Sequence, residues 1–98
     1  MVKKEEVMKA LENVIDPELG MNVVELGLVY DVKVKNDMVE VDMTLTSPGC
    51  PIAPQIMEDA EENIKSVKGV KKARVEFTFD PPWTPEKMSE EARLRLGI

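Results

Sequence analysis

Residues 28–46 constrain the fold more than any other stretch, because apolar and polar side chains alternate along them on both sides of a short turn. Apolar side chains occupy every second position through residues 28–35 and again through 39–46. This period of two is typical of β-strands with one buried face. Asn36-Asp37 separates the two runs, and asparagine tolerates the positive φ of a tight turn. The pattern predicts a β-hairpin whose apolar face must be covered by another layer.

Two segments with helical periodicity can supply that layer. Apolar residues recur three to four positions apart over residues 3–14, which predicts an amphipathic helix. Asp16-Pro17 is expected to end it, because a residue before proline avoids the helical conformation, and residues 18–22 are then expected to form a loop. The same helical spacing over 52–67 predicts a second helix that stops at Gly69.

The last third of the chain is expected to add a strand and a short helix. Alternating apolar residues from Val70 to Phe79 predict the strand, with Phe77 and Phe79 packed in the core. Thr84-Pro85 fits the start of a helix. Trp83 is predicted to pin this tail to the body of the protein.

Together these elements predict an α+β fold, a two-layer sandwich in which a small mixed sheet carries helices on one face. The chain has 98 residues and is expected to form a single domain over residues 1–98.

Composition excludes several classes of function. The net charge is −6 and lysines interleave with glutamates, so no nucleic-acid partner is expected. No apolar run is long enough for a membrane span or signal sequence, and a single cysteine cannot form an internal disulfide, which predicts a cytoplasmic protein. The chain contains no histidine, so it offers no serine–histidine or cysteine–histidine nucleophile pair.

The one cysteine, Cys50, lies in the segment TSPGCPIAP, where the second hairpin strand gives way to the second helix. Pro51 suits the first position of that helix, although the helix could instead start at Pro54 and leave Cys50 in the loop. An anion at a helix N-terminus gains about 0.3–1 kcal/mol, which is less than the energy of one pKa unit. Cys50 therefore needs a cation or a metal to become a strong nucleophile.

The hydroxyl groups of Thr46 and Ser47 flank this thiol and could bind a sulfide or a carboxylate. The alternative is structural: Thr46 is the last outward-facing strand residue, Ser47 forms the turn, and Cys50 is a small buried hydrophobic residue.

The segment IDPELG holds a second group of candidate residues. Asp16 and Glu18 could form a simple turn with solvated carboxylates, or they could converge on Cys50. If they converge, their negative charge opposes thiolate formation, so the cluster would suit a metal ion better than a free nucleophile.

DPELGMNVVELGLVYDV, LTSPGCPIAPQI and FDPPWTPEKMSEEARLRLGI, which together span most of the chain, resemble the MIP-type, SufT/PaaD-like family of iron–sulfur assembly domains. The resemblance implies a two-layer α+β fold and a role in maturing iron–sulfur proteins. The residues that match the family's site are Asp16, Glu18, Leu19, Thr46, Gly49, Cys50 and Pro51, and Ser47 stands where many members have a second threonine. The chain lacks both the cysteine-rich tail of the phenylacetate-pathway members and the phosphate-binding loop of the ATPase carriers, so it resembles the stand-alone, SufT-like branch.

This resemblance implies a non-catalytic accessory factor whose partners are iron–sulfur assembly proteins and client apo-proteins. Iron–sulfur clusters usually take four thiolates, whereas one chain supplies one and a symmetric homodimer would supply two. Cys50 is thus expected to bind iron, a cluster or a partner's thiol only transiently.

Two other functions remain open at this point. CPIAP resembles, with spacing off by one residue, the CPxP turn of persulfide-relay proteins, which would make Cys50 a sulfur carrier. The chain could also be an interaction module with a structural cysteine.

Overall fold

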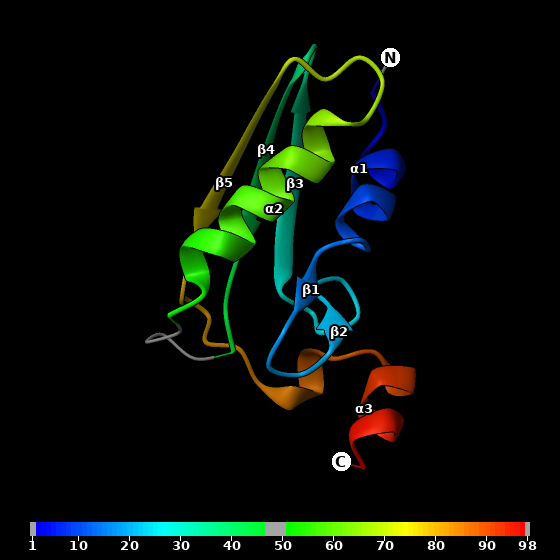
Figure 1. The fold of residues 1–98 in the computed structure, drawn as a ribbon, viewed down its shortest axis with the longest axis vertical. Coiled ribbons are helices and arrows are strands. Elements are labelled where there is room, and N and C mark those ends of the chain that lie inside the picture. Colours follow the sequence, from blue (N-terminus) through cyan, green and yellow to red (C-terminus); the bar gives the residue numbers. More distant parts are fainter. Residues whose placement is uncertain (1, 47–50, 98) are drawn as a thin grey trace.

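Residues 2–46 and 51–97, which the computed structural model describes, form three α-helices and two β-sheets (Figure 1). In chain order the elements are α1 (Lys4–Leu11), β1 (Ile15–Asp16), β2 (Met21–Asn22), β3 (Val29–Lys35), β4 (Met38–Met43), α2 (Ala53–Lys65), β5 (Lys72–Phe77), the 3₁₀ turn η1 (Pro85–Lys87) and α3 (Glu90–Leu96). None of the helices in these two ranges is both long enough and apolar enough to cross a membrane.

The main sheet has the strand order β3-β4-β5. β3 and β4 pair antiparallel as the predicted hairpin, and Asn36 in its turn has a φ of 55°. β5 pairs parallel to β4 on the other side, after α2 has carried the chain back along the sheet. The predicted α+β fold with a mixed sheet is confirmed.

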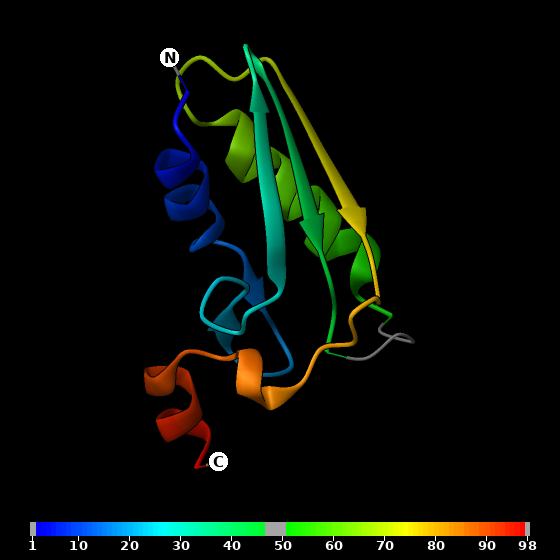
Figure 2. The ribbon, with the colours of Figure 1, turned by 180° about the vertical axis from the view of Figure 1, so that it is seen from behind.

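α1 and α2 cover one face of the main sheet (Figure 2). On that face Val41 of β4 lies opposite Val32 on β3 and Val75 on β5, and all three are buried. The residues of α2 that face them recur every four positions and are fully buried: Ile56, Ala60 and Ile64. Each large aliphatic side chain buried in this layer contributes about 1.5–3 kcal/mol.

The C-terminal segment crosses one end of the sheet and is held there by side chains and backbone. The Trp83 Nε1–H donates to the Leu26 carbonyl at 2.6 Å, as expected for a tryptophan that pins the tail. The Tyr30 hydroxyl donates to the Pro81 carbonyl at 2.9 Å, and the Ser89 N–H donates to the Glu25 carbonyl at 2.8 Å. These bonds fix residues 81–89 against the loops around β1 and β2.

The predicted last helix is in fact two short elements. The 3₁₀ turn η1 begins directly after Thr84, and the α-helix α3 begins at Glu90. Ser89 is the N-cap of α3, because its hydroxyl accepts the Ala92 N–H at 3.1 Å. Gly97 ends α3 with a φ of 73°. The second cap, Ser89, interrupts the single helix that Thr84-Pro85 had suggested.

Three other boundaries differ from prediction. The first helix ends at Leu11, because the Val14 N–H bonds the Leu11 carbonyl three residues back and tightens the last turn. The following segment, predicted as a loop, contains the two-residue strands β1 and β2. The third strand begins at Lys72 and ends at Phe77.

The prediction for Phe79 is wrong as well. Its side chain is 41% exposed, because the strand has already ended at Phe77. Phe77 itself is half-buried and packs against the core.

Candidate functional site

The turn between β1 and β2 carries the first motif, and Asp16 organises it. The Asp16 side chain is only 2% exposed, and its Oδ1 accepts the Glu18 N–H at 2.8 Å. The Asp16 carbonyl also accepts the Gly20 N–H at 2.8 Å. Asp16 is therefore buried within the turn and is not a solvated carboxylate. Its hydrogen bond fixes the backbone at Glu18.

The two other matched residues of this turn have different environments. Glu18 is exposed, while its backbone N–H is bonded to the buried Asp16. Leu19 is half-buried and packs against the core. The turn thus combines an apolar anchor with a surface carboxylate.

A second turn follows β2 and was not predicted. The Asn22 Oδ1 accepts the N–H groups of Val24 at 3.0 Å and Glu25 at 2.8 Å, while the Glu25 Oε1 accepts the Asn22 N–H at 3.0 Å. The Glu25 Oε2 also bonds Arg95 of α3 at 2.7 Å. This reciprocal bonding is that of a capping box, and the spacing Asn-x-x-Glu in the sequence was the signal for it.

The end of β4 leads into the second motif. Thr44, at a polar position of the alternating pattern, is fully buried, and its N–H donates to the Leu28 carbonyl at 2.8 Å. Its Oγ1 has no hydrogen-bond partner among the described residues. Thr46 is half-buried and is the last described residue before residues 47–50.

The helix that follows the second motif begins at Ala53, with Ile52 as its N-cap. Pro51 lies outside the helix and is exposed, so of the two predicted helix starts the one at Pro51 is wrong and the one near Pro54 is correct to within a residue. Pro54 occupies the first turn instead, where its missing N–H costs nothing because first-turn N–H groups have no intrahelical partner.

Ser47, Gly49 and Cys50 lie outside the described residues, so the approach of Asp16 and Glu18 to Cys50 stays a prediction. Figures 1 and 2 agree that the β1–β2 turn and the chain after β4 lie at the same end of the molecule. The first motif and the described segments that flank the second motif therefore lie at one end of the main sheet, which we call the site end.

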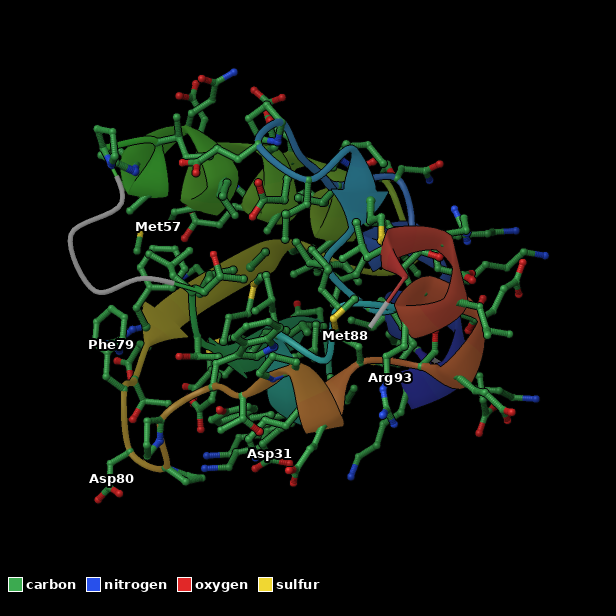
Figure 3. The ribbon with its side chains drawn as sticks, turned by 90° about the horizontal axis from the view of Figure 1, so that it is seen from below. Asp31, Met57, Phe79, Asp80, Met88 and Arg93 are labelled. Atoms are coloured by element: carbon green, nitrogen blue, oxygen red, sulfur yellow. The ribbon has the colours of Figure 1, made fainter. Side chains whose placement is uncertain are left out.

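The site end also exposes apolar surface. Figure 3 shows Met57 of α2 and Phe79 after β5 on the same side of the molecule. Phe79 is 41% exposed and Met57 is half-buried. Exposed aromatic and methionine side chains are typical of surfaces that bind other proteins.

The described residues hold no group of three carboxylates or other side-chain donors arranged to bind a metal ion.

Fold and motifs together define a class of protein, a small α+β domain with a mixed sheet whose described candidate residues lie outside the main strands. Residues 4–77 match the family described as iron–sulfur cluster assembly protein, and the chain belongs to that family.

Individual relatives agree with this assignment. The chain is 48% identical over 96 residues to the Fe-S protein maturation auxiliary factor YitW of Bacillus subtilis, covering 97% of this chain and 94% of that one. It is 45% identical over 86 residues to the Fe-S protein maturation auxiliary factor SufT of Staphylococcus aureus, covering 87% of this chain and 98% of the relative. Among solved structures, a domain of unknown function from Bacillus anthracis superposes with a TM-score of 0.93 at 43% identity, over 97% of this chain and 92% of that one.

Proposed function

We propose that this chain is an auxiliary factor in the maturation of iron–sulfur proteins, and that it acts in the cytoplasm as a single, non-catalytic domain over residues 1–98. Membership of the iron–sulfur cluster assembly family supports the general role. The likeness to YitW and SufT over nearly their whole length supports the stand-alone, auxiliary form of that role.

The chemistry of the proposal centres on Cys50. Iron–sulfur clusters usually require four thiolate ligands, and this chain provides one cysteine and no histidine. Cys50 would bind iron, a cluster or a client thiol transiently, while the client, an assembly protein or a second copy of the chain supplies the other ligands. Because the chain supplies so few ligands, this arrangement favours transfer of the iron or cluster to a client over its storage.

The observation that carries the proposal is the buried carboxylate of Asp16. Its bond to the Glu18 N–H holds a turn at the same end of the molecule as the chain that leaves β4 and the start of α2, the two segments on either side of Cys50 in the sequence. In this arrangement Asp16 positions the turn and Glu18 provides a negative charge for an iron-loaded partner. Thr46, Ser47, Gly49 and Pro51 would present the thiol to a partner, and Leu19 anchors the turn that bears Glu18 to the core.

The test is a Cys50→Ala variant in host cells that lack their own copy of the chain, with the activity of a [4Fe–4S] dehydratase as the readout. We expect the variant to melt at the temperature of the wild type and to leave the client largely inactive. Ser66→Ala, which keeps the thiol and removes only an exposed hydroxyl at the C-cap of α2, is the matched control and should retain most activity. Normal client activity in Cys50→Ala cells would overturn the proposal.

A further inference from the structure

A cluster of basic side chains lies at the end of the main sheet opposite the site end. β5 begins at Lys72, which pairs with Met38 beside the hairpin turn, and ends at Phe77, which pairs with Met43. Around the start of β5, four basic side chains line a hollow of about 260 Å³ together with two apolar residues: Lys65, Lys71, Lys72 and Arg74, with Met38 and Ala73. The chain as a whole has 19 acidic and 13 basic residues, so this hollow reverses the overall sign.

Among the described residues, one of the four cations of this hollow has an ion-pair partner and three have none. Arg74 pairs with Glu76 on the same strand. Within residues 2–46 and 51–97, Lys65, Lys71 and Lys72 form no ion pair, and all three are exposed. An anionic partner would therefore meet uncompensated positive charge, which favours both encounter and orientation.

The backbone beside the hollow is an open sheet edge. The N–H groups of Lys72 and Thr78 point toward the hairpin, since they donate to Asp37 at 3.2 Å and Met43 at 2.8 Å. Alternate residues of a strand point their N–H groups the opposite way. The Val75 N–H does so, and it donates to Glu61 Oε2 of α2 at 3.2 Å.

This alternation places the Ala73 N–H on the open edge, directly beside the lysines. Glu61 closes the same edge at Val75, two residues further along. The free stretch is therefore short, and it lies where the positive charge is concentrated.

We propose that the first half of the β5 edge docks an extended acidic segment of a partner protein. The segment adds as a strand beside Ala73, and its carboxylates face Lys65, Lys71 and Lys72. The lysines are exposed, which suits a peptide more than a single small anion, since small anions need converging buried donors. A long polyanion would extend beyond the lysines over a molecule with a net charge of −6, whereas a short acidic segment can remain beside them.

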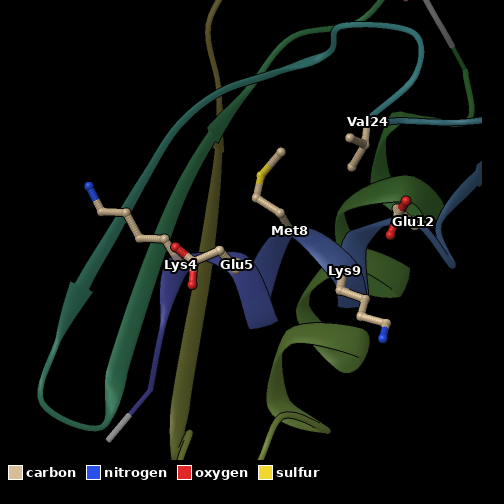
Figure 4. Close-up of a pocket in the computed structure, with 6 residues that line it drawn as sticks. All are labelled: Lys4, Glu5, Met8, Lys9, Glu12 and Val24. Atoms are coloured by element: carbon tan, nitrogen blue, oxygen red, sulfur yellow. The ribbon is translucent and has the colours of Figure 1, made fainter.

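A second hollow provides an internal comparison. It lies along the outer side of α1, has a volume of about 370 Å³, and is lined by Lys4, Glu5, Met8, Lys9, Glu12 and Val24 (Figure 4). Its two lysines are balanced by two glutamates, so it offers no preference for an acidic ligand. Lysines on α1 therefore make a matched control for charge reversal.

The experiment uses the full chain and a fluorescein-labelled twelve-residue peptide of alternating glutamate and threonine. Fluorescence anisotropy measures affinity, and amide chemical shifts locate the binding surface. We expect saturable binding that weakens with salt, with shifts concentrated at residues 65 and 71–74. A peptide with lysine in place of glutamate should not bind.

Two variants separate the charge from the strand edge. The triple variant Lys65→Glu, Lys71→Glu, Lys72→Glu should bind at least about tenfold more weakly, whereas Lys3→Glu, Lys4→Glu, Lys9→Glu, which changes the net charge equally, should bind almost normally. Ala73→Pro keeps every lysine but removes the edge N–H, and should weaken binding about fivefold. Thermal melting verifies that each variant is folded.

The proposal would be overturned by the absence of saturable binding, by equal losses in the two triple variants, or by equally tight binding of a single-stranded oligonucleotide of the same charge. Unchanged affinity in a folded Ala73→Pro variant would overturn the strand addition. The assay needs neither Cys50 nor iron, so its failure is distinguishable from a failure of the proposed maturation role.

Discussion

Charged side chains have opposite environments at the two ends of the main sheet. At the site end the Asp16 carboxylate is 2% exposed and bonds the backbone of its own turn. At the other end Lys65, Lys71 and Lys72 are exposed and without ion pairs to described residues. The Asp16 carboxylate supports the turn at the site end, whereas the three lysines at the opposite end are available to a partner. Substitution of Asp16 should therefore affect stability, whereas substitution of the three lysines should affect binding at the opposite end of the sheet, which we call the lysine end.

The largest effect is expected where the C-terminal segment packs against the site end. Gly27 has a φ of 73°, and a Cβ there would overlap the backbone carbonyl of Lys87. Gly27→Ala should lower the free energy of unfolding by about 3–5 kcal/mol, from overlap and left-handed strain together. Gly20→Ala is the matched control, because Gly20 has a φ of 68° but open space around it, and should cost about 1 kcal/mol. Urea unfolding gives both values, and equal losses would contradict the packing.

The next effect is expected at Asp16 itself. Asp16→Ala removes the acceptor of the Glu18 N–H from a buried position and should cost about 1–3 kcal/mol. Asp16→Asn keeps an oxygen acceptor and should recover most of that loss. Asp31→Ala, which breaks an exposed pair with Lys33, should cost less than about 0.5 kcal/mol. Chemical denaturation of the three variants tests the ranking, and an Asp16→Ala protein as stable as Asp31→Ala would refute the structural role of Asp16.

A smaller effect is expected where α2 closes the β5 edge. Glu61→Ala removes the acceptor of the Val75 N–H and should cost about 0.5–1.5 kcal/mol, with faster hydrogen exchange of the Val75 amide. Glu62→Ala, at the neighbouring exposed position of α2, should change neither quantity. Unaltered exchange at Val75 would show that Glu61 does not close the edge in solution.

The smallest effect is expected at the lysine end. Replacing Lys65, Lys71 and Lys72 together by glutamine should shift the free energy of unfolding by less than about 0.5 kcal/mol, since these side chains are exposed and unpaired among the described residues. Thermal melts measure the shift. A loss above about 1 kcal/mol would mean that these lysines stabilise the fold, which would remove the contrast between the two ends.

Elements with a long periodic pattern could be predicted from the sequence. The alternation over 28–46 and the turn at Asn36 predicted the hairpin, and the apolar spacing over 52–67 predicted α2. In both cases one face of the element packs in or against the core over many residues. The apolar pattern in the sequence is therefore long enough to recognise. Trp83 was also predicted well, because a lone tryptophan with an N–H donor usually binds the body of a small domain.

Features that depend on contacts between distant residues could not be predicted in the same way. β1 and β2 have two residues each, too few to show a period. Thr44 is fully buried although it occupies a polar position of the alternating pattern, and Phe79 is exposed because β5 ends early. The first motif was predicted as candidate site residues, but the burial of Asp16 and the capping box of Asn22 and Glu25 required the three-dimensional structure.

The central claim is that Cys50 and the turn held by Asp16 form one site, and the single cysteine allows a direct test. A nitroxide spin label on Cys50 broadens the amide signals of nearby residues, and the reduced label provides the diamagnetic reference. We predict strong broadening at Glu18 and Gly20, and little at Lys71 and Lys72 on the opposite end of a molecule 39 Å long. Equal signal loss at the two ends, or none at the turn, would contradict the claim.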